Sequence, residues 1–272
     1  MKRFLSIFFI LFILFIAQIS LAGEIVIKGS TTVLPIVQAA AEIFMKQHPE
    51  IKISVSGGGS GNGIKALIDG ACDIADTSRF IKQKEVKMAI AKGIYPVPHR
   101  IALDGVTPIV HPSNPIKNLT LTQLHHIYTG KTKNWKKVGG FDHNIIVVSR
   151  DTSSGTYEVW REKVMKKDRV TPRALLQASN GAVIQTVAHN RWAIGYVGIG
   201  YLNKQVKAIK VDGVIPTKDT IRIGKFPITR PLFMFTNGWP EGEIATFINF
   251  VLSHIGQRIV EKTGYVAIYP VQ

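Results

Sequence analysis

Apolar residues in this chain follow two periods that alternate along its length. Short apolar runs, typical of buried strands, are each paired with a longer stretch in which apolar positions recur every three or four residues, as in helices. The paired strand and helix stretches are residues 25–28 with 34–47, 51–55 with 63–69, 145–148 with 157–166, and 192–197 with 182–189. This alternation predicts an α/β fold with largely parallel sheets.

Two stretches rich in proline and glycine interrupt the alternation. The first, residues 105–115, includes Pro108, and the second covers residues 211–231. Because such residues break regular elements, we expect the chain to leave one lobe, build a second, and return. A C-terminal stretch, residues 241–262, has helical apolar spacing and predicts one amphipathic helix that packs on the first lobe. The predicted lobes are residues 23–106 with 226–272, and residues 107–225.

The N-terminal residues have the composition of an export signal. Two basic residues precede an apolar run, residues 4–17, which is shorter than the about 20 residues that span a bilayer. Small residues follow at the end of the stretch, as a signal peptidase requires. We therefore predict a signal peptide over residues 1–22, cleaved near Ala22–Gly23, and a periplasmic protein. The alternative is that the segment is retained as an N-terminal anchor.

The chain carries a formal net charge of +16, but its basic residues are dispersed. They form no run of five and do not interleave with aromatic residues as in proteins that bind single-stranded nucleic acid. A general positive field favours anions, so we expect a small anion and no nucleic acid as partner. The single cysteine, Cys72, excludes an internal disulfide.

Three segments share one design, in which Gly, Ser and Thr residues stand between a strand and a helix. They are residues 28–32, 56–63 and 153–156. A helix start exposes backbone N–H groups and about half a positive charge, glycine lets the backbone approach a ligand, and hydroxyls add donors. One such start is a common anion site. Three in one chain indicate convergence on a single small anion.

Ordinary helix capping is the alternative explanation for each segment. Capping explains residues 56–63 poorly, because a cap needs one residue and this segment supplies five glycines. A phosphate loop of nucleotide hydrolases would need Lys directly after its last glycine, and Gly63 is followed by Ile64.

Charged residues accompany the segments. Arg150 ends the strand before the third segment, and its planar fork can hold two oxygens of a tetrahedral oxyanion; a surface ion pair with Asp151 or Glu158 is the alternative. Ser78 and Arg79 close another predicted strand, at the edge where ligands collect in open α/β sheets. Arg79 could equally be a solvated charge.

The sequence offers little support for an enzyme or for a metal site. A hydrolase elbow, Gly-x-Ser-x-Gly, would need glycine at position 62, where the chain has Asn62. The pair His125 and His126 has no carboxylate or cysteine at metal-ligand spacing. We expect no cofactor, no bound metal and no enzymatic activity.

The chain resembles the periplasmic phosphate-binding proteins of ABC phosphate importers. The resemblance rests on "GSTTVLP" at 29–35, "GGGSGNGIKALIDG" at 57–70, "DIADTSR" at 73–79 and "SRDTSSGTYEVW" at 149–160, with "AIGYVGIGYL" at 193–202 and "ITRPLFMF" at 228–235 in support. It implies a two-lobed type II periplasmic binding protein fold with phosphate in a cleft between the lobes. The ligand-binding residues we predict are Ser30, Thr31, Thr32, Ser60, Gly61, Ser78, Arg79, Arg150, Ser154, Gly155 and Thr156.

One position departs from the family pattern. The best-known members place an aspartate where this chain has Ser78, and that carboxylate accepts the proton of hydrogen phosphate and repels sulfate. A serine oxygen can accept the same proton but carries no charge. Asp76 and Asp151 are candidates to supply the missing carboxylate.

These features predict an exported receptor, which we expect to be monomeric, that captures inorganic phosphate and delivers it to the membrane permease of an ABC importer. Two alternatives stay open at this point. The protein could bind another tetrahedral oxyanion, namely sulfate, molybdate or tungstate, or it could be a secreted phosphatase.

Overall fold

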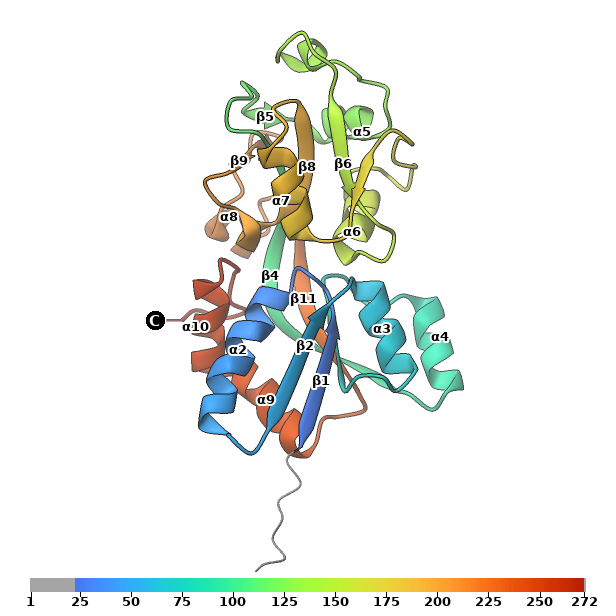
Figure 1. Cartoon of the computed structure of the whole chain (residues 1–272), viewed down its shortest axis with the longest axis vertical. Coiled ribbons are helices and arrows are strands. Elements are labelled where there is room, and N and C mark those ends of the chain that lie inside the picture. The colour runs from blue at the N-terminus through green and yellow to red at the C-terminus, as the bar shows by residue number, and fades with distance from the viewer. Residues whose placement is uncertain (1–22, 272) are drawn as a thin grey trace, which may run out of the picture.

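The computed structural model describes residues 23–271 and divides into two lobes joined by long strands (Figure 1). The signal peptide predicted over residues 1–22 lies outside the described residues. None of the helices in the described part is both long and apolar enough to cross a bilayer.

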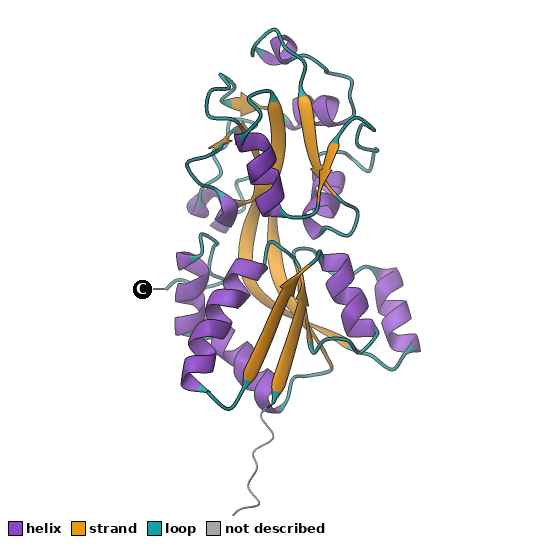
Figure 2. Cartoon of the chain, in the orientation of Figure 1, coloured by secondary structure: helices purple, strands orange, loops and turns teal. Residues whose placement is uncertain are grey.

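Strands and helices alternate through most of the chain (Figure 2). The strands are β1 (Glu24–Gly29), β2 (Lys52–Gly57), β3 (Ile74–Thr77), β4 (Pro96–Val110), β5 (Asn118–Leu119), β6 (Ile146–Arg150), β7 (Leu175–Gln177), β8 (Ala193–Gly198), β9 (Lys207–Ala208), β10 (Lys210–Val211) and β11 (Thr229–Asn237). The α-helices are α2 (Leu34–Gln47), α3 (Ser60–Ile68), α4 (Gln83–Ala91), α5 (Leu121–Tyr128), α6 (Gly155–Lys163), α7 (Asn180–Ala188), α8 (Lys218–Arg222), α9 (Gly242–Leu252) and α10 (His254–Lys262). Two short 3-10 helices cover Trp135–Val138 and Ile199–Tyr201.

One sheet runs through both lobes, with the strand order β2-β1-β3-β11-β4-β8-β6-β7 and with β9 paired to β4. Strand β1 is parallel to β2 and β3, and β6 is parallel to β7 and β8, as the sequence predicts. Strand β11 is antiparallel to β3 and β4, and β4 is antiparallel to β8. Strands β4 and β11 carry the chain between the lobes (Figure 1).

The first interruption expected from the sequence is wrong in its detail. Strand β4 continues through Gly105 and Pro108, pairing with β11 up to Gly105 and with β8 from Val106 onward. Pro108 has no N–H to donate, and it is tolerated because its backbone faces the side where β11 has ended. On that side its carbonyl accepts a hydrogen bond from the Ile209 N–H at 3.1 Å. The predicted boundary between residues 106 and 107 falls at this exchange of partners, and the lobe boundaries stay a prediction.

The C-terminal stretch forms two helices instead of the one predicted. Ser253 separates α9 from α10, and its Oγ accepts a hydrogen bond from the Gly256 N–H at 3.2 Å. Both helices pack against α2, as expected, where Phe44 lies edge-on to Phe247 at 5.2 Å and to Phe250 at 5.4 Å. Aromatic pairs of this kind each contribute about 0.5–1.5 kcal/mol beyond their buried area.

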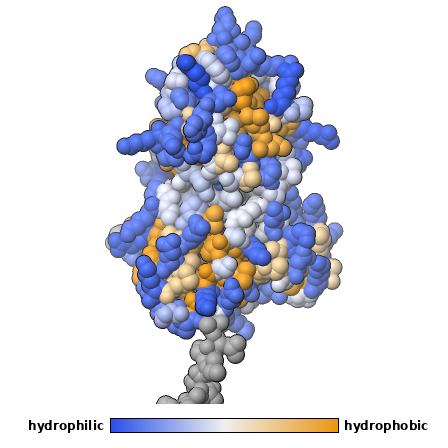
Figure 3. Space-filling view, in the orientation of Figure 1, coloured by the Kyte–Doolittle hydropathy of each residue, from blue (hydrophilic) through white to orange (hydrophobic). Residues whose placement is uncertain are grey.

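The surface is mostly polar, with apolar patches on both lobes (Figure 3). At the level where the lobes meet, the surface is pale, which means intermediate hydropathy.

Candidate functional site

The three Gly, Ser and Thr segments meet at the junction of the lobes. Strands β1, β2 and β3 of one lobe, and β6 of the other, all end there, and α2, α3, α6 and α7 begin there (Figure 1). Ligands of open α/β sheets bind beyond the carboxyl ends of the strands. The junction is therefore the candidate site.

The first segment is held against the other lobe by hydrogen bonds. Ser30, Thr31 and Thr32 are all buried, and Ser30 Oγ accepts from the Thr32 N–H at 3.1 Å. Asn180, the first residue of α7, donates from Nδ2 to Thr31 Oγ1 at 3.1 Å and to Thr32 Oγ1 at 3.0 Å. The Tyr201 hydroxyl donates to the Thr31 carbonyl at 2.5 Å.

The glycine-rich turn before α3 touches the third segment directly. The Gly61 N–H donates to the Ser153 carbonyl at 2.9 Å, and Ser153 Oγ donates to the Gly58 carbonyl at 3.3 Å. Gly59 has φ +100°, and a Cβ there would lie 2.9 Å from the Ser153 carbonyl oxygen. Glycine is thus required for this approach of the two lobes.

Ser60, Ser78 and Gly155 form a close contact between the lobes. The Ser78 N–H donates to Ser60 Oγ at 3.0 Å, and the two hydroxyl oxygens lie 3.3 Å apart. A Cβ on Gly155 would lie 2.6 Å from Ser78 Oγ and closer still to Ser60 Oγ. The first helical residue of α6 therefore sits directly on two hydroxyls of the other lobe.

Arg150 ends β6 and is almost completely buried, with only 1% of its surface exposed. Its Nε donates to the Gln177 carbonyl and its Nη2 to the Ala178 carbonyl, each at 2.9 Å. Nη1 is buried and has no hydrogen-bond partner among the described residues. Burial lowers the pKa of this guanidinium, and the nearby charge of Arg230 adds to that effect against the opposing charge of Asp151. An unmet buried donor of this kind is costly unless a ligand supplies the acceptor.

The third segment combines ordinary capping with contacts across the junction. Ser154 caps α6, since its Oγ accepts from the Tyr157 N–H at 3.2 Å. Thr156, in the first turn of α6, shares a hydrogen bond with Thr32 between their Oγ1 atoms at 3.0 Å. The capping interpretation therefore holds for Ser154, while Thr156 faces the first segment.

Arg79 differs from the other predicted residues. Its Nη1 and Nη2 donate to the two carboxylate oxygens of Glu85 at 2.9 and 2.7 Å, and Nη1 also donates to the Phe80 carbonyl at 2.9 Å. Both terminal nitrogens of its fork are thus occupied by neighbours within the same lobe.

Four residues at the junction were missed in the sequence. Besides Asn180 and Tyr201, these are Arg230 on β11 and Asp104 on β4, whose side chains form a buried ion pair with 2.7 Å between Nη2 and Oδ2. Asn180 follows Ser179, which caps α7, so a fourth strand–helix start in the sequence could have revealed it. Arg230 stands within the family-like stretch at 228–235.

The two carboxyl groups proposed to replace the aspartate missing at Ser78 are differently placed. Asp151 Oδ1 accepts hydrogen bonds from the N–H and the hydroxyl of Ser153. Asp76 is buried, its Oδ1 has no partner among the described residues, and burial raises its pKa well above the usual value. Burial therefore disfavours the charged form of Asp76, and the source of the carboxylate missing at Ser78 stays a prediction.

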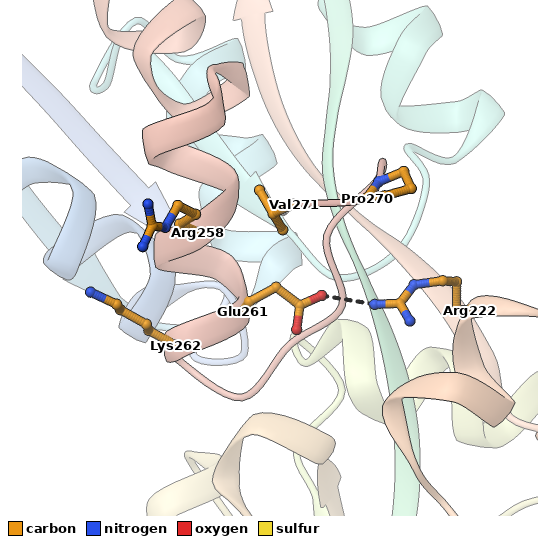
Figure 4. Close-up of a pocket in the computed structure, with 6 residues that line it drawn as sticks. All are labelled: Arg222, Arg258, Glu261, Lys262, Pro270 and Val271. Carbon is orange, nitrogen blue, oxygen red and sulfur yellow. Dashed lines mark hydrogen bonds and ion pairs between the residues drawn. The ribbon is translucent and has the colours of Figure 1, made fainter.

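A cavity of about 490 Å³ lies elsewhere on the molecule, between α8 and α10 (Figure 4). Arg222, Arg258 and Lys262 line it together with Glu261 and the C-terminal Pro270 and Val271. Glu261 accepts from Lys218 at 2.7 Å and from Arg222 at 3.0 Å.

Within residues 23–271, no group of three or more His, Cys, Asp or Glu side chains is arranged to hold a metal ion.

Comparisons with known proteins identify the family of this chain. Residues 17–254 match the model of the PBP superfamily domain. Proteins named phosphate-binding protein PstS are similar over most of the chain: that of Staphylococcus epidermidis is 38% identical over 88% of this chain and 77% of its own length, and that of Bacillus subtilis is 34% identical over 91% and 81%.

Two solved structures also match the fold. One, described as a phosphate ABC transporter substrate-binding protein with bound phosphate from Clostridium perfringens, has a TM-score of 0.85 at 35% identity and covers 91% of this chain and 100% of its own. An ABC-type phosphate transport receptor from Vibrio cholerae has a TM-score of 0.74 at 36% identity, with the same two coverages. The α/β, two-lobed type II binding protein fold predicted from the sequence is confirmed. The chain therefore belongs to the PBP superfamily and, within it, to the family of phosphate-binding proteins that carry the name PstS.

Proposed function

We propose that this protein is a receptor that captures inorganic phosphate between its lobes and delivers it to the permease of an ABC-type phosphate importer. The observation that carries the proposal is Arg150 Nη1, a buried cationic donor without a partner among the described residues, at the end of a strand that leads into the hydroxyl-rich junction. The PstS relatives and the phosphate-bound structural neighbour support the choice of anion.

The proposed ligand contacts come from both lobes. Hydroxyls of one lobe and Arg150 with the first turn of α6 in the other can all donate to one anion. The proposed set is Ser30, Thr31, Thr32, Ser60, Ser78, Arg150, Ser154, Gly155 and Thr156. We leave out Arg79, whose fork is held by Glu85, and Gly61, whose N–H is held by the Ser153 carbonyl.

Binding energy of the required size is available from these contacts. Hydrogen bonds to charged groups contribute about 1.5–3 kcal/mol each and neutral ones about 1 kcal/mol, whereas micromolar binding needs about 8 kcal/mol after ordering costs. Because the donors lie on both lobes, an open form offers only part of them. The anion therefore binds the closed form more tightly and shifts the population toward it.

Selectivity is proposed to rest on hydroxyl oxygens instead of a carboxylate. Ser60 and Ser78 can accept the proton of hydrogen phosphate, and burial disfavours the charged form of Asp76. Sulfate carries no such proton, but the uncharged hydroxyls do not repel it. We therefore propose that phosphate is preferred over sulfate by a smaller margin than a carboxylate would give.

Further parts of the proposal follow from the family. We propose an exported, monomeric receptor without enzymatic activity, whose predicted lobes, residues 23–106 with 226–272 and residues 107–225, close on the anion. A phosphatase is the rival from another class. Hydrolysis of a chromogenic phosphate ester at a rate above the buffer blank would support that rival.

A competition series tests the choice of anion. Protein freed of bound anion by unfolding and refolding is titrated calorimetrically with phosphate, arsenate, sulfate and molybdate. We expect phosphate and arsenate to bind most tightly and sulfate to bind measurably but more weakly. If sulfate or molybdate binds and phosphate does not displace it, the protein is a receptor for another oxyanion.

A further inference from the structure

The buried ion pair of Arg230 and Asp104 stands where the chain passes between the lobes. The two residues face each other in the antiparallel register of β11 and β4, one position before β4 exchanges β11 for β8. Arg230 is 3% exposed and Asp104 is fully buried. Such a pair is expensive to desolvate, so its retention calls for full hydrogen bonding.

Arg230 contacts both lobes through one planar group. Nε donates to Asp104 Oδ2 at 2.8 Å, and Nη1 donates to the carbonyl of Ser78 at 3.0 Å. Nη2 donates to Thr32 Oγ1 at 3.2 Å and to Thr156 Oγ1 at 3.0 Å. Thr32 precedes α2 in one lobe, whereas Thr156 is the second residue of α6 in the other. One guanidinium thus connects a hydroxyl from each side of the junction.

Asp104 also accepts a hydrogen bond from outside its ion pair. Its Oδ1 accepts from the Ile199 N–H at 2.9 Å, just after β8. Gly198 packs so closely that a Cβ there would lie 3.0 Å from both carboxylate oxygens. The carboxylate therefore fixes the position of Arg230 relative to the backbone of β8.

We propose that Arg230, held by Asp104, is the positioning residue that couples anion binding to closure of the lobes. This inference rests on the proposed function. When the lobes separate, Thr156 moves away and Nη2 keeps Asp104 Oδ2 and Thr32 Oγ1 but loses its hydrogen bond across the junction. That charge-assisted hydrogen bond exists only in the closed form and stabilises it. When phosphate draws the hydroxyls of Thr32 and Thr156 together, the fork of Arg230 is satisfied and the closed form is stabilised.

Charge assigns different roles to the two buried arginines. Arg230 is neutralised by Asp104 at 2.7 Å, whereas Arg150 lies 3.7 Å from its nearest carboxylate, that of the partly exposed Asp151. The net positive charge at the junction therefore comes from Arg150. Arg150 attracts the anion, and Arg230 orients the threonines around it.

Arg230→Lys separates this role from a merely structural one. Lysine keeps a cation beside Asp104 but cannot span Ser78, Thr32 and Thr156, because it lacks the planar fork. Arg222→Lys, at an exposed ion pair on α8, is the matched control. Phosphate affinity is measured by titration calorimetry, and closure by the decrease in radius of gyration that saturating phosphate causes in small-angle X-ray scattering.

We expect wild type and Arg222→Lys to contract equally on phosphate binding. Arg230→Lys should lose more than half of the contraction even at saturation, and its affinity should fall about tenfold, as expected for loss of a charge-assisted hydrogen bond. If Arg230→Lys contracts as fully as wild type, the coupling role is wrong. If wild type neither binds phosphate nor contracts, the proposed function fails as well.

A double-mutant cycle with Thr156→Val tests the route of the coupling. If Arg230 acts through Thr156, the losses of affinity in the double variant should be clearly smaller than the product of the two single losses. Independent effects, in which the single losses multiply, would overturn the assignment of Thr156 as the group that Arg230 positions.

Discussion

Two polar clusters join the lobes of this protein. They differ in how completely their hydrogen-bonding groups find partners within the protein. In the cluster between α8 and α10, Glu261 accepts from Lys218 and Arg222 of the neighbouring helix and from the Ala267 N–H at 3.0 Å. The cluster at the junction contains Arg150, which is buried and keeps one terminal nitrogen without a partner among the described residues.

The comparison shows which property marks a binding site in this fold. The α8–α10 cluster borders a cavity of about 490 Å³, yet its carboxylate is already paired with the two cations nearest to it, Lys218 and Arg222. Partly exposed ion pairs of this kind contribute about 0–1 kcal/mol each. At the junction, Arg150 is buried and one of its donor nitrogens has no partner among the described residues. A ligand that accepts from this nitrogen would form a hydrogen bond in a buried position.

Removing the unmet donor should have the largest effect. We expect Arg150→Ala to lower phosphate affinity by about tenfold or more, because each charge-assisted hydrogen bond contributes about 1.5–3 kcal/mol. Titration calorimetry measures the loss, and circular dichroism checks that the variant is folded. The control is Arg222→Ala in the α8–α10 cluster, which should leave affinity unchanged. Unchanged affinity of Arg150→Ala would refute the site.

A methyl group placed between the lobes should have the next largest effect. In Gly155→Ala the new Cβ would lie 2.6 Å from Ser78 Oγ, nearer than any real Cβ contact, so the closed form must open slightly. We expect phosphate affinity to fall about tenfold, which corresponds to about 1.4 kcal/mol, while the thermal midpoint without phosphate changes little.

Gly181→Ala is the matched control for this change. Gly181 also lies in the first turn of a helix at the junction, but a Cβ there meets only Ser179 Oγ at 3.8 Å, an ordinary contact. Its phosphate affinity should equal that of wild type. Equal losses in Gly155→Ala and Gly181→Ala would mean that helix propensity, and not the closed contact, determines the outcome.

The sequence predicted the architecture well because hydrophobic periodicity is local. The helix at 34–47 was placed with its observed bounds, and the three hydroxyl segments were found because their composition is visible within a few residues. The single helix predicted at 241–262 failed at Ser253. Gly256 packs there against the carbonyls of Phe250 and Val251, a close approach that periodicity does not encode.

The missed part of the site depends on contacts distant in sequence. Arg230 is the second residue of β11 and Asp104 lies within β4, and neither stands next to a hydroxyl-rich helix start. They meet only because β11 and β4 pair in one register, across 126 positions of the chain. The position of Arg150 was found, by contrast, because a hydroxyl-rich helix start follows it directly.

The two clusters also hold carboxyl groups whose pKa values shift in opposite directions. Burial raises the pKa of Asp76 well above its usual value. Burial acts in the same direction on Glu261, but hydrogen bonds from Lys218 and from the Ala267 N–H, with the charges of Lys218 and Arg222, outweigh it and hold the pKa of Glu261 below its usual value. The folded state therefore prefers a neutral Asp76 and an ionised Glu261.

These pKa shifts predict that Asp76→Asn and Glu261→Gln change stability in opposite directions. Both changes should be smaller than the losses of phosphate affinity predicted above. Above the unfolded pKa of about 3.9, the folded protein holds a proton on Asp76 that the unfolded chain releases, so the free energy of unfolding falls as pH rises toward the folded pKa. Asp76→Asn removes this loss and should raise the thermal midpoint at pH 7 more than at pH 4. Glu261→Gln should lower the free energy of unfolding at pH 7 by about 1 kcal/mol or less, and this difference should shrink as pH falls from the unfolded pKa toward the lower folded pKa. Calorimetric melting of both variants at the two pH values decides the matter. A destabilised Asp76→Asn at pH 7 would show that the carboxyl group is ionised and paired, which would restore Asp76 as the carboxylate that replaces the aspartate missing at Ser78.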